Sequence, residues 1–523
     1  MIDYNFERLT IEEKIGQLIV FGFDALELND HTIDMIKDYK AGNVILFARN
    51  VKTPRQLFEL NKSLQKLAIE ALNIPLFISI DQEGGMVTRI KNGATYFPGA
   101  MALSASNNLK NSYESGRIMG QELEALGINM NLAPSLDVNN NPYNPVIGVR
   151  SFGDDPRRVS DYGVQNIKGL QEHVIATAKH FPGHGDTSVD SHLDLPKIDK
   201  DLNQLKELEL IPFVDAIKCG VKAIMSSHIN FPALNENGLP STLSWQCLTG
   251  LLRQKLGFEG LILTDGMQMK AIQTYYSTHV GALMAITAGA NLVTFSHDEH
   301  LQKKSIEYIK NAYINGTKET QNRIDERVRR VLKYKQENIV LNLERTYEDV
   351  QDIIEDKSSK EFSLNVLRDA LTLVKGNNVD ISKKTLLIAS SPLSTTIADE
   401  DDGGFNIIQL VNKELPDIDT FEISVRVTKT EIFEIKQREK EYEQVIFCTY
   451  NANIYQNQLD IIRHLNISNN LYVISMRNPY DSVFEKNIKN LVLLYEYTPN
   501  SVKVLLEYLI GKILPKGVPP VSL

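Results

Sequence analysis

The chain has 523 residues, of which 42% are hydrophobic and 23% are charged, and this composition is ordinary for a soluble globular protein. Its length predicts two domains rather than one. The formal net charge of -10 leaves no surplus of basic residues to neutralise phosphates, which argues against a nucleic-acid binder.

The cysteines and the N-terminal segment indicate the cellular compartment in which the protein is expected. Cys219, Cys247 and Cys448 are far apart and match no metal-binding spacing, so we expect no disulfide framework. Acidic residues stand near the start, where a signal peptide needs basic ones, and no apolar run reaches the length of a membrane span. We therefore expect a cytoplasmic protein without a membrane partner, and the oligomeric state stays open.

Eight apolar segments alternate with helical patterns in the first part of the chain. One of these patterns is the helix expected over 54–72, where Leu57, Leu60, Leu64 and Leu67 keep helical spacing. The apolar segments lie at 17–23, 42–48, 76–80, 129–134, 174–178, 223–228, 261–264 and 290–296. This alternation predicts a (β/α)8 barrel over residues 1–335.

Residues capable of chemistry follow many of these apolar segments. They are Asp81, Asp137, Lys179, His180, His228 and Asp265. Because a barrel of this kind builds its site at the C-terminal ends of its strands, we expect all of them at one rim.

The rest of the chain predicts a linker and a second domain. Residues 336–365 are rich in charged side chains and predict a solvated helical linker. From 366 to 523 the strand pattern restarts, with apolar runs at 371–374, 385–389, 444–449, 471–476 and 491–495. With helices between them, these runs predict a smaller α/β sandwich with a mostly parallel sheet.

The densest chemistry lies in the tract from Lys179 to His192, which reads KHFPGHGDTSVDSH. It follows the apolar run 174–178 and contains a proline and two glycines, which predict a loop at the end of a strand. Three interpretations are open. The tract could be a solvated surface loop, a metal site, or part of a catalytic site. A metal site would use His184, Asp186, Asp190 and His192, although these residues lack the spacing of a common metal motif.

Asp265 and His192 are the candidates for catalysis. Asp265 follows an apolar strand directly and could act as an anionic nucleophile, or it could simply cap the next helix. His192 lies two residues after Asp190, whose carboxylate could orient the imidazole and make it more basic. Such a pair would supply a proton donor near neutral pH. Polar groups that could orient a hydroxylated ligand are Asp81, Arg89, Arg150, Lys179 and His180.

At four places the sequence resembles glycoside hydrolase family 3, and within it the β-N-acetylglucosaminidases. The motifs are IDQEGG at 80–85, VIGVRSFG at 146–153, the tract 179–192 and TDGM at 264–267. The segments 475–481 and 515–521 are similar to the C-terminal domain of the two-domain members of that family.

The resemblance implies specific roles. Asp265 would be the nucleophile and His192 the acid/base, with Asp190 as its partner. The residues that would bind the N-acetylglucosamine ring are Asp81, Arg89, Arg150, Lys179 and His180, to which we add His228 from its place after a strand. Neither a metal nor an organic cofactor is implied.

The family chemistry is retaining, and the implied substrate is a muropeptide or a disaccharide of N-acetylglucosamine and N-acetylmuramic acid from cell-wall recycling. A histidine in place of a second carboxylic acid repels an anionic acceptor less, so phosphorolysis remains an alternative to hydrolysis. A β-glucosidase of the same family and a non-catalytic sugar-binding protein are further alternatives. Met86 stands where single-domain members commonly have an arginine.

Overall fold

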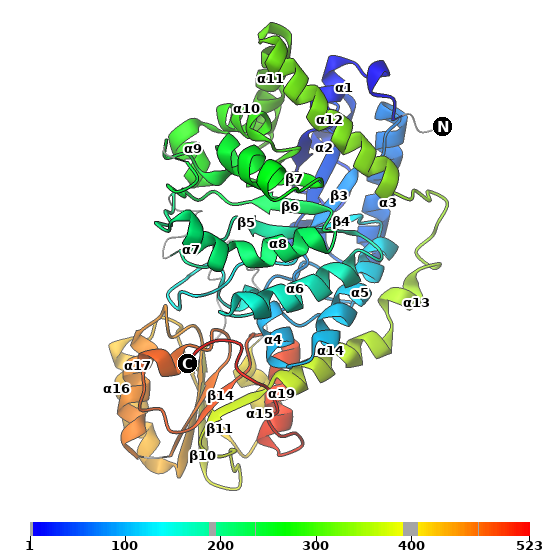
Figure 1. Cartoon of the computed structure of the whole chain (residues 1–523). Coiled ribbons are helices and arrows are strands. Elements are labelled where there is room, and N and C mark those ends of the chain that lie inside the picture. Colours follow the sequence, from blue (N-terminus) through cyan, green and yellow to red (C-terminus); the bar gives the residue numbers. More distant parts are fainter. Residues whose placement is uncertain (1–3, 188–194, 236, 391–405, 469) are drawn as a thin grey trace.

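The structure is a computed structural model, and it describes residues 4–187, 195–235, 237–390, 406–468 and 470–523. Two units follow each other along the chain (Figure 1). The first is a closed barrel of eight parallel strands, β1 to β8, and the second contains a six-stranded sheet. The prediction of an eight-stranded barrel with a smaller α/β domain is therefore confirmed.

The barrel strands coincide with the eight apolar runs of the sequence. They are β1 Ile19–Phe21, β2 Asn43–Leu46, β3 Phe77–Ile80, β4 Met130–Asn131, β5 Ile175–Phe181, β6 Ala223–Ser226, β7 Leu261–Gly266 and β8 Leu292–Phe295. Nearly every residue in them is buried, because helices cover the outside of the barrel and side chains fill its inside. β1 pairs with β8, which closes the barrel.

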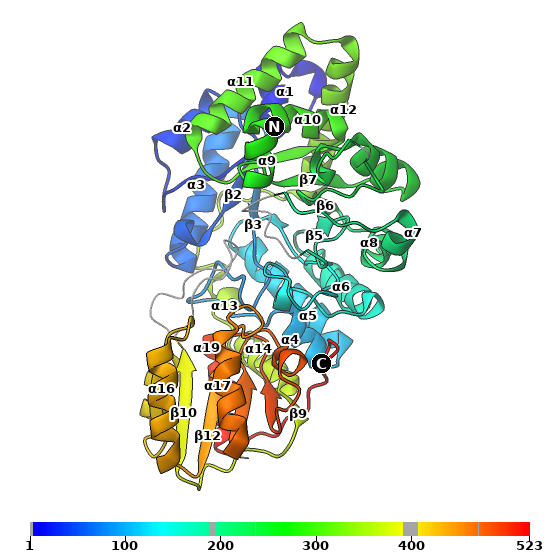
Figure 2. The ribbon, with the colours of Figure 1, turned by 90° about the vertical axis from the view of Figure 1, so that its left-hand side faces the viewer.

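Helices surround this barrel (Figures 1 and 2). They are α1 Ile11–Gly16, α2 Asp30–Lys37, α3 Pro54–Leu72, α4 Ala100–Ala105, α5 Leu109–Ala125, α6 Pro156–Leu170, α7 Leu202–Glu207, α8 Leu210–Lys218, a π-helix Gln246–Lys255, α9 Lys270–Tyr276, α10 Thr278–Ala288, α11 Glu299–Asn315 and α12 Lys318–Asn338. None of the helices in the described ranges is long and apolar enough to cross a membrane.

The helix α3 shows how local sequence sets these elements. Thr53 caps it by accepting a hydrogen bond from the backbone of Gln56, and Pro54 occupies the first turn, where its missing N–H costs nothing. Its apolar residues Leu57, Leu60, Leu64 and Leu67 are buried against the barrel. The helix spans the range that its apolar spacing predicts.

The segment between the two units is helical only in part. α12 continues to Asn338, residues 339–350 have little regular structure, and the short α13 Gln351–Ile354 and the longer α14 Lys357–Ala370 follow. α14 lies beside α4 of the barrel at the boundary of the two units (Figure 1).

The second sheet has the strand order β11-β10-β12-β13-β14-β9, with β9 antiparallel and the others parallel. Its strands are β9 Thr372–Lys375, β10 Thr385–Ser390, β11 Asp419–Ile423, β12 Gln444–Thr449, β13 Leu471–Ser475 and β14 Leu491–Leu493. Its helices are α15 Ile407–Glu414, α16 Lys429–Arg438, α17 Asn457–Leu465, α18 Asp481–Phe484 and α19 Pro499–Leu509. The sequence patterns predicted every one of these strands except β11.

The hydrophobic core of the second unit includes residues of the barrel unit. Met101, Ala102 and Ala105 from α4, together with Val149, belong to the same buried cluster as the residues of the second sheet. The two units therefore share apolar surface that is continuous with a domain core.

Candidate active site

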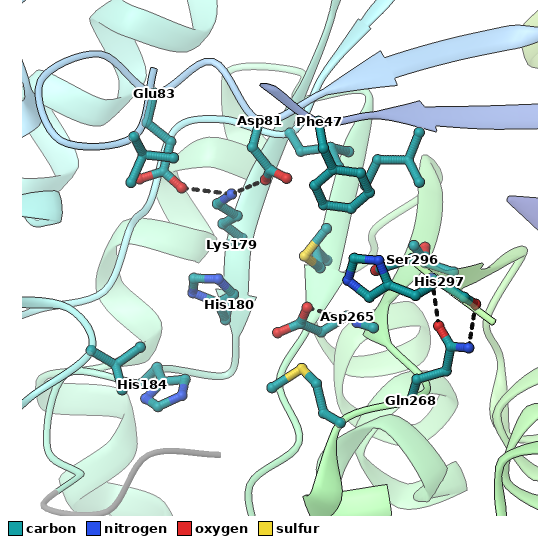
Figure 3. A pocket seen from close by; sticks show the side chains of 18 of the residues that line it. Phe47, Asp81, Glu83, Lys179, His180, His184, Asp265, Gln268, Ser296 and His297 are labelled. Carbon is teal, nitrogen blue, oxygen red and sulfur yellow. Dashed lines mark hydrogen bonds and ion pairs between the residues drawn. The ribbon is translucent and has the colours of Figure 1, made fainter. Parts of the chain in front are cut away.

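A pocket of about 330 Å³ opens at the rim formed by the C-terminal ends of the barrel strands. Its walls carry most of the residues expected there. Figure 3 shows the side chains of Asp81, Lys179, His180 and Asp265 around one space. The charged and histidine side chains that line it include Asp81, Glu83, Arg89, Arg150, Lys179, His180, His184 and Asp265.

Irregular strand ends turn these side chains toward the pocket. In a regular strand successive side chains face opposite sides, so the neighbours Lys179 and His180 would not both reach one cavity. The pairing of β5 with β6 shifts register between Ala178 and Phe181, which interrupts the alternation at these two residues. β7 shifts register against β8 between Leu263 and Gly266, on either side of Asp265.

One wall of the pocket is a network of buried ion pairs. The Lys179 ammonium lies 2.7 Å from a carboxylate oxygen of Asp81 and 2.7 Å from one of Glu83. Arg150 binds both oxygens of Glu83, at 2.9 Å from Nε and 2.7 Å from Nη2. Arg89 approaches Asp81 at 3.8 Å. Figure 3 shows Lys179 between the two carboxylates.

These contacts keep the network charged. Burial alone would raise the pKa of Glu83, but Arg150 and Lys179 outweigh it and hold that pKa far below its usual value. Burial would likewise lower the pKa of Lys179, and the Asp81 and Glu83 carboxylates raise it instead. The wall therefore presents fixed donors and acceptors to a ligand, as recognition of sugar hydroxyls requires.

A second carboxylate sets the orientation of His180. The buried Asp137 accepts a hydrogen bond from Nδ1 of His180 at 2.7 Å, and its other oxygen accepts from the backbone N–H groups of His184 and His180. Burial would raise the pKa of Asp137, but the neighbouring His180 lowers it below the usual value. With Nδ1 held by a carboxylate, His180 can offer Nε2 to the pocket.

His184 lies beside His180, and the two rings meet in an edge-to-face arrangement. Burial and then the charge of His180 lower the pKa of His184 to about 4, so the ring is neutral near neutral pH. Its Nδ1 is 2.9 Å from the hydroxyl of Thr187.

Asp265 faces the pocket from the end of β7 (Figure 3). Its Oδ1 accepts a hydrogen bond from the backbone of Gly266 at 2.7 Å, and the side chain is only partly buried. A carboxylate in this position, opposite the donors of Lys179 and His180, has the chemistry of a nucleophile that attacks a bound electrophilic carbon.

His228 differs from the other expected ligand-binding residues. It is buried, it does not line the pocket, and both of its ring nitrogens face protein atoms: Nδ1 lies 2.9 Å from the hydroxyl of Thr242 and Nε2 lies 3.0 Å from the carbonyl of Gly266. The side chain therefore supports the turn that carries Asp265, and ligand binding by His228 stays a prediction. Its position after a strand is right, but its ring points into packed protein.

Asp190 and His192 lie outside the described residues. The metal interpretation of the same tract also depends on them. Of the other two candidate ligands, His184 lines the pocket and Asp186 pairs with Lys200 at 2.7 Å. Within the ranges that the structure describes, no group of three or more His, Cys, Asp or Glu side chains could hold a metal ion.

Glu83 and Asp137 are among the site residues to which the sequence assigned no role. Glu83 lies two residues after Asp81, and that spacing places both side chains on one side of an extended segment, which is a signal that could have revealed it. Asp137 was expected at the rim, but its partner His180 is 43 positions away and only the fold brings the two together.

Met86 lies at the boundary between the two units. Its sulfur lies 3.3 Å from the backbone N–H of Tyr497, and its side chain packs against the core of the second unit. Met86 is thus part of the contact between the two units.

Comparison with known proteins identifies the family. Residues 10–334 match the glycosyl hydrolase family 3 N terminal domain. The chain is 39% identical over 276 residues to β-hexosaminidase A from Pseudoalteromonas piscicida, a match that covers 50% of this chain and 46% of that protein. It is 34% identical over 264 residues to a β-hexosaminidase from Nitrosomonas eutropha, which covers 49% of this chain and 74% of that one. The chain thus spans less than half of the first relative.

The similarity to solved structures extends over both units. A glycoside hydrolase family 3 β-N-acetylglucosaminidase from Paenibacillus sp. str. FPU-7 superposes with a TM-score of 0.90 at 37% sequence identity, covering 98% of this chain and 99% of that one. With the family domain matched across the barrel and the two-unit architecture shared, the chain belongs to glycosyl hydrolase family 3.

Proposed function

We propose that this chain is a retaining exo-β-N-acetylglucosaminidase that removes N-acetylglucosamine from the non-reducing end of its substrate. The observation that carries the proposal is the pocket, in which Asp265 faces the buried network of Lys179, Glu83 and Arg150. Its volume of about 330 Å³ lies at the small end of the range for ligand pockets, about 300–1,000 Å³, which suits a single sugar unit.

The names of the relatives support the identity of that sugar. Two are β-hexosaminidases, and the solved structure with 37% identity is a β-N-acetylglucosaminidase. In the proposed site Asp81, Arg89, Arg150, Lys179 and His180 hold the sugar ring. The partner is thus an N-acetylglucosamine-containing saccharide.

The proposed reaction has two steps. In the first, the Asp265 carboxylate attacks the anomeric carbon while the bond to the leaving oxygen breaks and His192 protonates that oxygen. In the second, water attacks the same carbon, His192 takes up its proton and the Asp265 carboxylate is released. Asp190 orients His192 in both steps.

Lys270 supports an acidic group in the substrate. It lines the pocket, it is exposed, and it makes no ion pair with any residue in the described ranges. It is also the first residue of α9, where the helix dipole disfavours a positive charge, so helix stability does not account for it. We therefore propose muropeptides or N-acetylglucosaminyl-muramic acid fragments from cell-wall recycling in the cytoplasm as the natural substrates.

The test is to incubate the protein with 4-nitrophenyl β-N-acetylglucosaminide, with and without phosphate, and to identify the sugar product. We expect free N-acetylglucosamine, first released as the β-anomer. Release of the sugar 1-phosphate whenever phosphate is present would favour phosphorolysis instead. No release of sugar by the wild type, together with turnover of the corresponding glucoside, would favour a β-glucosidase.

The nucleophile is tested separately. A mechanism-based fluorinated N-acetylglucosaminyl fluoride should add one glycosyl mass to the peptide that contains Asp265, and Asp265→Ala should abolish turnover. Full activity of that variant, or labelling of a different peptide, would contradict the assignment.

A further inference from the structure

The turn Gly148–Arg150 joins the pocket to the second unit. Its three consecutive residues face three different surroundings. Gly148 lies so close to the side chain of Asn478 that a Cβ on this glycine would be 2.4 Å from Oδ1 of the asparagine, and its φ of +47° also favours glycine. Val149 is buried in the hydrophobic core of the second unit. Arg150 faces the pocket and binds Glu83.

A hydrogen-bonded chain fixes the same turn from behind. The amide of Asn139 donates from Nδ2 to the hydroxyl of Tyr480 at 2.5 Å, and its Oδ1 accepts from the backbone N–H of Gly148 at 3.1 Å. Both side chains are buried. Burial raises the pKa of Tyr480, so its hydroxyl stays protonated over the physiological range. Tyr480 therefore holds the side-chain amide of Asn139, and that amide holds the backbone of Gly148, where the turn starts.

The second unit also contacts the loop that carries Glu83. The buried Glu496 accepts a hydrogen bond from the backbone of Gly99 at 2.9 Å and lies against Gly85. Tyr497 donates its backbone N–H to the sulfur of Met86. Both partners of the Arg150–Glu83 pair thus lie on loops that the second unit holds from outside the pocket.

We propose that the second unit positions the sugar-binding cation Arg150, with Tyr480 as a positioning residue that acts through Asn139 and Gly148. This inference rests on the proposed function and assigns a role in substrate binding to a domain that contributes none of the side chains lining the pocket in the described ranges. Its physical basis is that a guanidinium binds a ligand tightly only if its backbone is held in the binding geometry before the ligand arrives.

The proposal is tested with Tyr480→Phe, which keeps the ring and removes only the hydroxyl. Losing one buried hydrogen bond should raise KM for 4-nitrophenyl β-N-acetylglucosaminide about three- to tenfold and leave kcat nearly unchanged. Asn139→Ser breaks the same chain at the other side chain and should give a similar rise in KM. Circular dichroism of each variant confirms that it is folded.

A double-mutant cycle shows whether the effect passes through Arg150. In an Arg150→Ala background, Tyr480→Phe should cause no further loss of kcat/KM, because the group that it positions is already gone. The matched control is Tyr508→Phe, whose buried hydroxyl accepts a hydrogen bond from the backbone of Val379 within the second unit. It should leave KM unchanged.

Three results would overturn the positioning role: an unchanged KM in Tyr480→Phe, an equal loss in both backgrounds, or an equal rise in KM in Tyr508→Phe. An inactive wild type would instead refute the proposed function. The two failures are therefore distinguishable.

Discussion

Glu83 gives the sharpest test of the site, because one carboxylate there holds two cations. Glu83→Gln preserves the shape of the side chain but removes its charge. Arg150 then loses its bidentate partner and keeps a longer bond to the carbonyl of Val146 at 3.4 Å, whereas Lys179 keeps Asp81 at 2.7 Å. Breaking a buried ion pair lowers the free energy of unfolding by about 3–5 kcal/mol. Because Lys179 retains a partner, we expect Glu83→Gln to lower it by about 3 kcal/mol near neutral pH.

The cost should depend on pH with a definite sign. The folded state holds the pKa of Glu83 well below its unfolded value, so the carboxylate stabilises the fold above the unfolded pKa, and this stabilisation is lost as the pH falls toward the folded value. With an unfolded pKa of about 4.3, the wild type should lose about 0.6 kcal/mol of its advantage over Glu83→Gln near pH 4, and more below that.

Urea denaturation followed by circular dichroism at the two pH values measures both effects, and KM for the aryl glycoside should rise in the same variant. The matched control is Glu122→Gln. Glu122 is also buried, but burial raises its pKa to about 7 and its bond is to the backbone of Thr95. As the pH rises through that value, the buried Glu122 carboxyl ionises and lowers the free energy of unfolding of the wild type. Glu122→Gln avoids this loss, so it should be no less stable than the wild type near pH 8. A Glu83→Gln cost below about 1 kcal/mol, or a gap that widens in acid, would refute the ion-pair reasoning.

Three further predictions concern proton transfer, tautomer and charge. His192→Ala should slow aryl glycosides with poor leaving groups about 10² to 10⁴ times more than those with activated ones, and equal slowing would indicate a structural role. Asp137→Asn should lower kcat/KM about 10- to 100-fold, because His180 loses its hydrogen bond to a charged carboxylate. A pH–rate profile and a kcat/KM identical to those of the wild type would contradict this. Lys270→Met should raise KM for a 3-carboxyumbelliferyl glycoside several-fold but not for the uncharged 4-methylumbelliferyl one, and the difference should shrink in high salt. Equal effects on the two substrates would exclude charge recognition by Lys270.

Most of the fold could be predicted because its strands are buried on both faces. Segments such as 261–264 and 223–228 are continuous apolar runs, which stand out from their polar surroundings in the sequence. β11 is the exception. It is one of the two edge strands of the second sheet, and its sequence DTFEI contains no apolar run like the TLV of the other edge strand, β9.

The candidate site could be predicted only in part, for a reason that lies in side-chain direction. The end of a strand fixes where a residue lies along the barrel but not which way its side chain points. Asp81, Lys179 and Asp265 line the pocket, whereas His228 turns toward Thr242. Contacts between distant segments are equally invisible in the sequence, as the bond between Asp137 and His180 illustrates.

The apolar residues of α4 that belong to the second core affect how the domains can be studied. A fragment that ended in the linker would expose Met101, Ala102, Ala105 and Val149 to water. Such a fragment would aggregate or rearrange to bury these side chains. Inactivity of such a fragment would report a damaged barrel rather than a missing catalytic contribution. By the same reasoning, a lineage could dispense with the second domain only after polar replacements had accumulated on that helix, so the two halves are bound to change together.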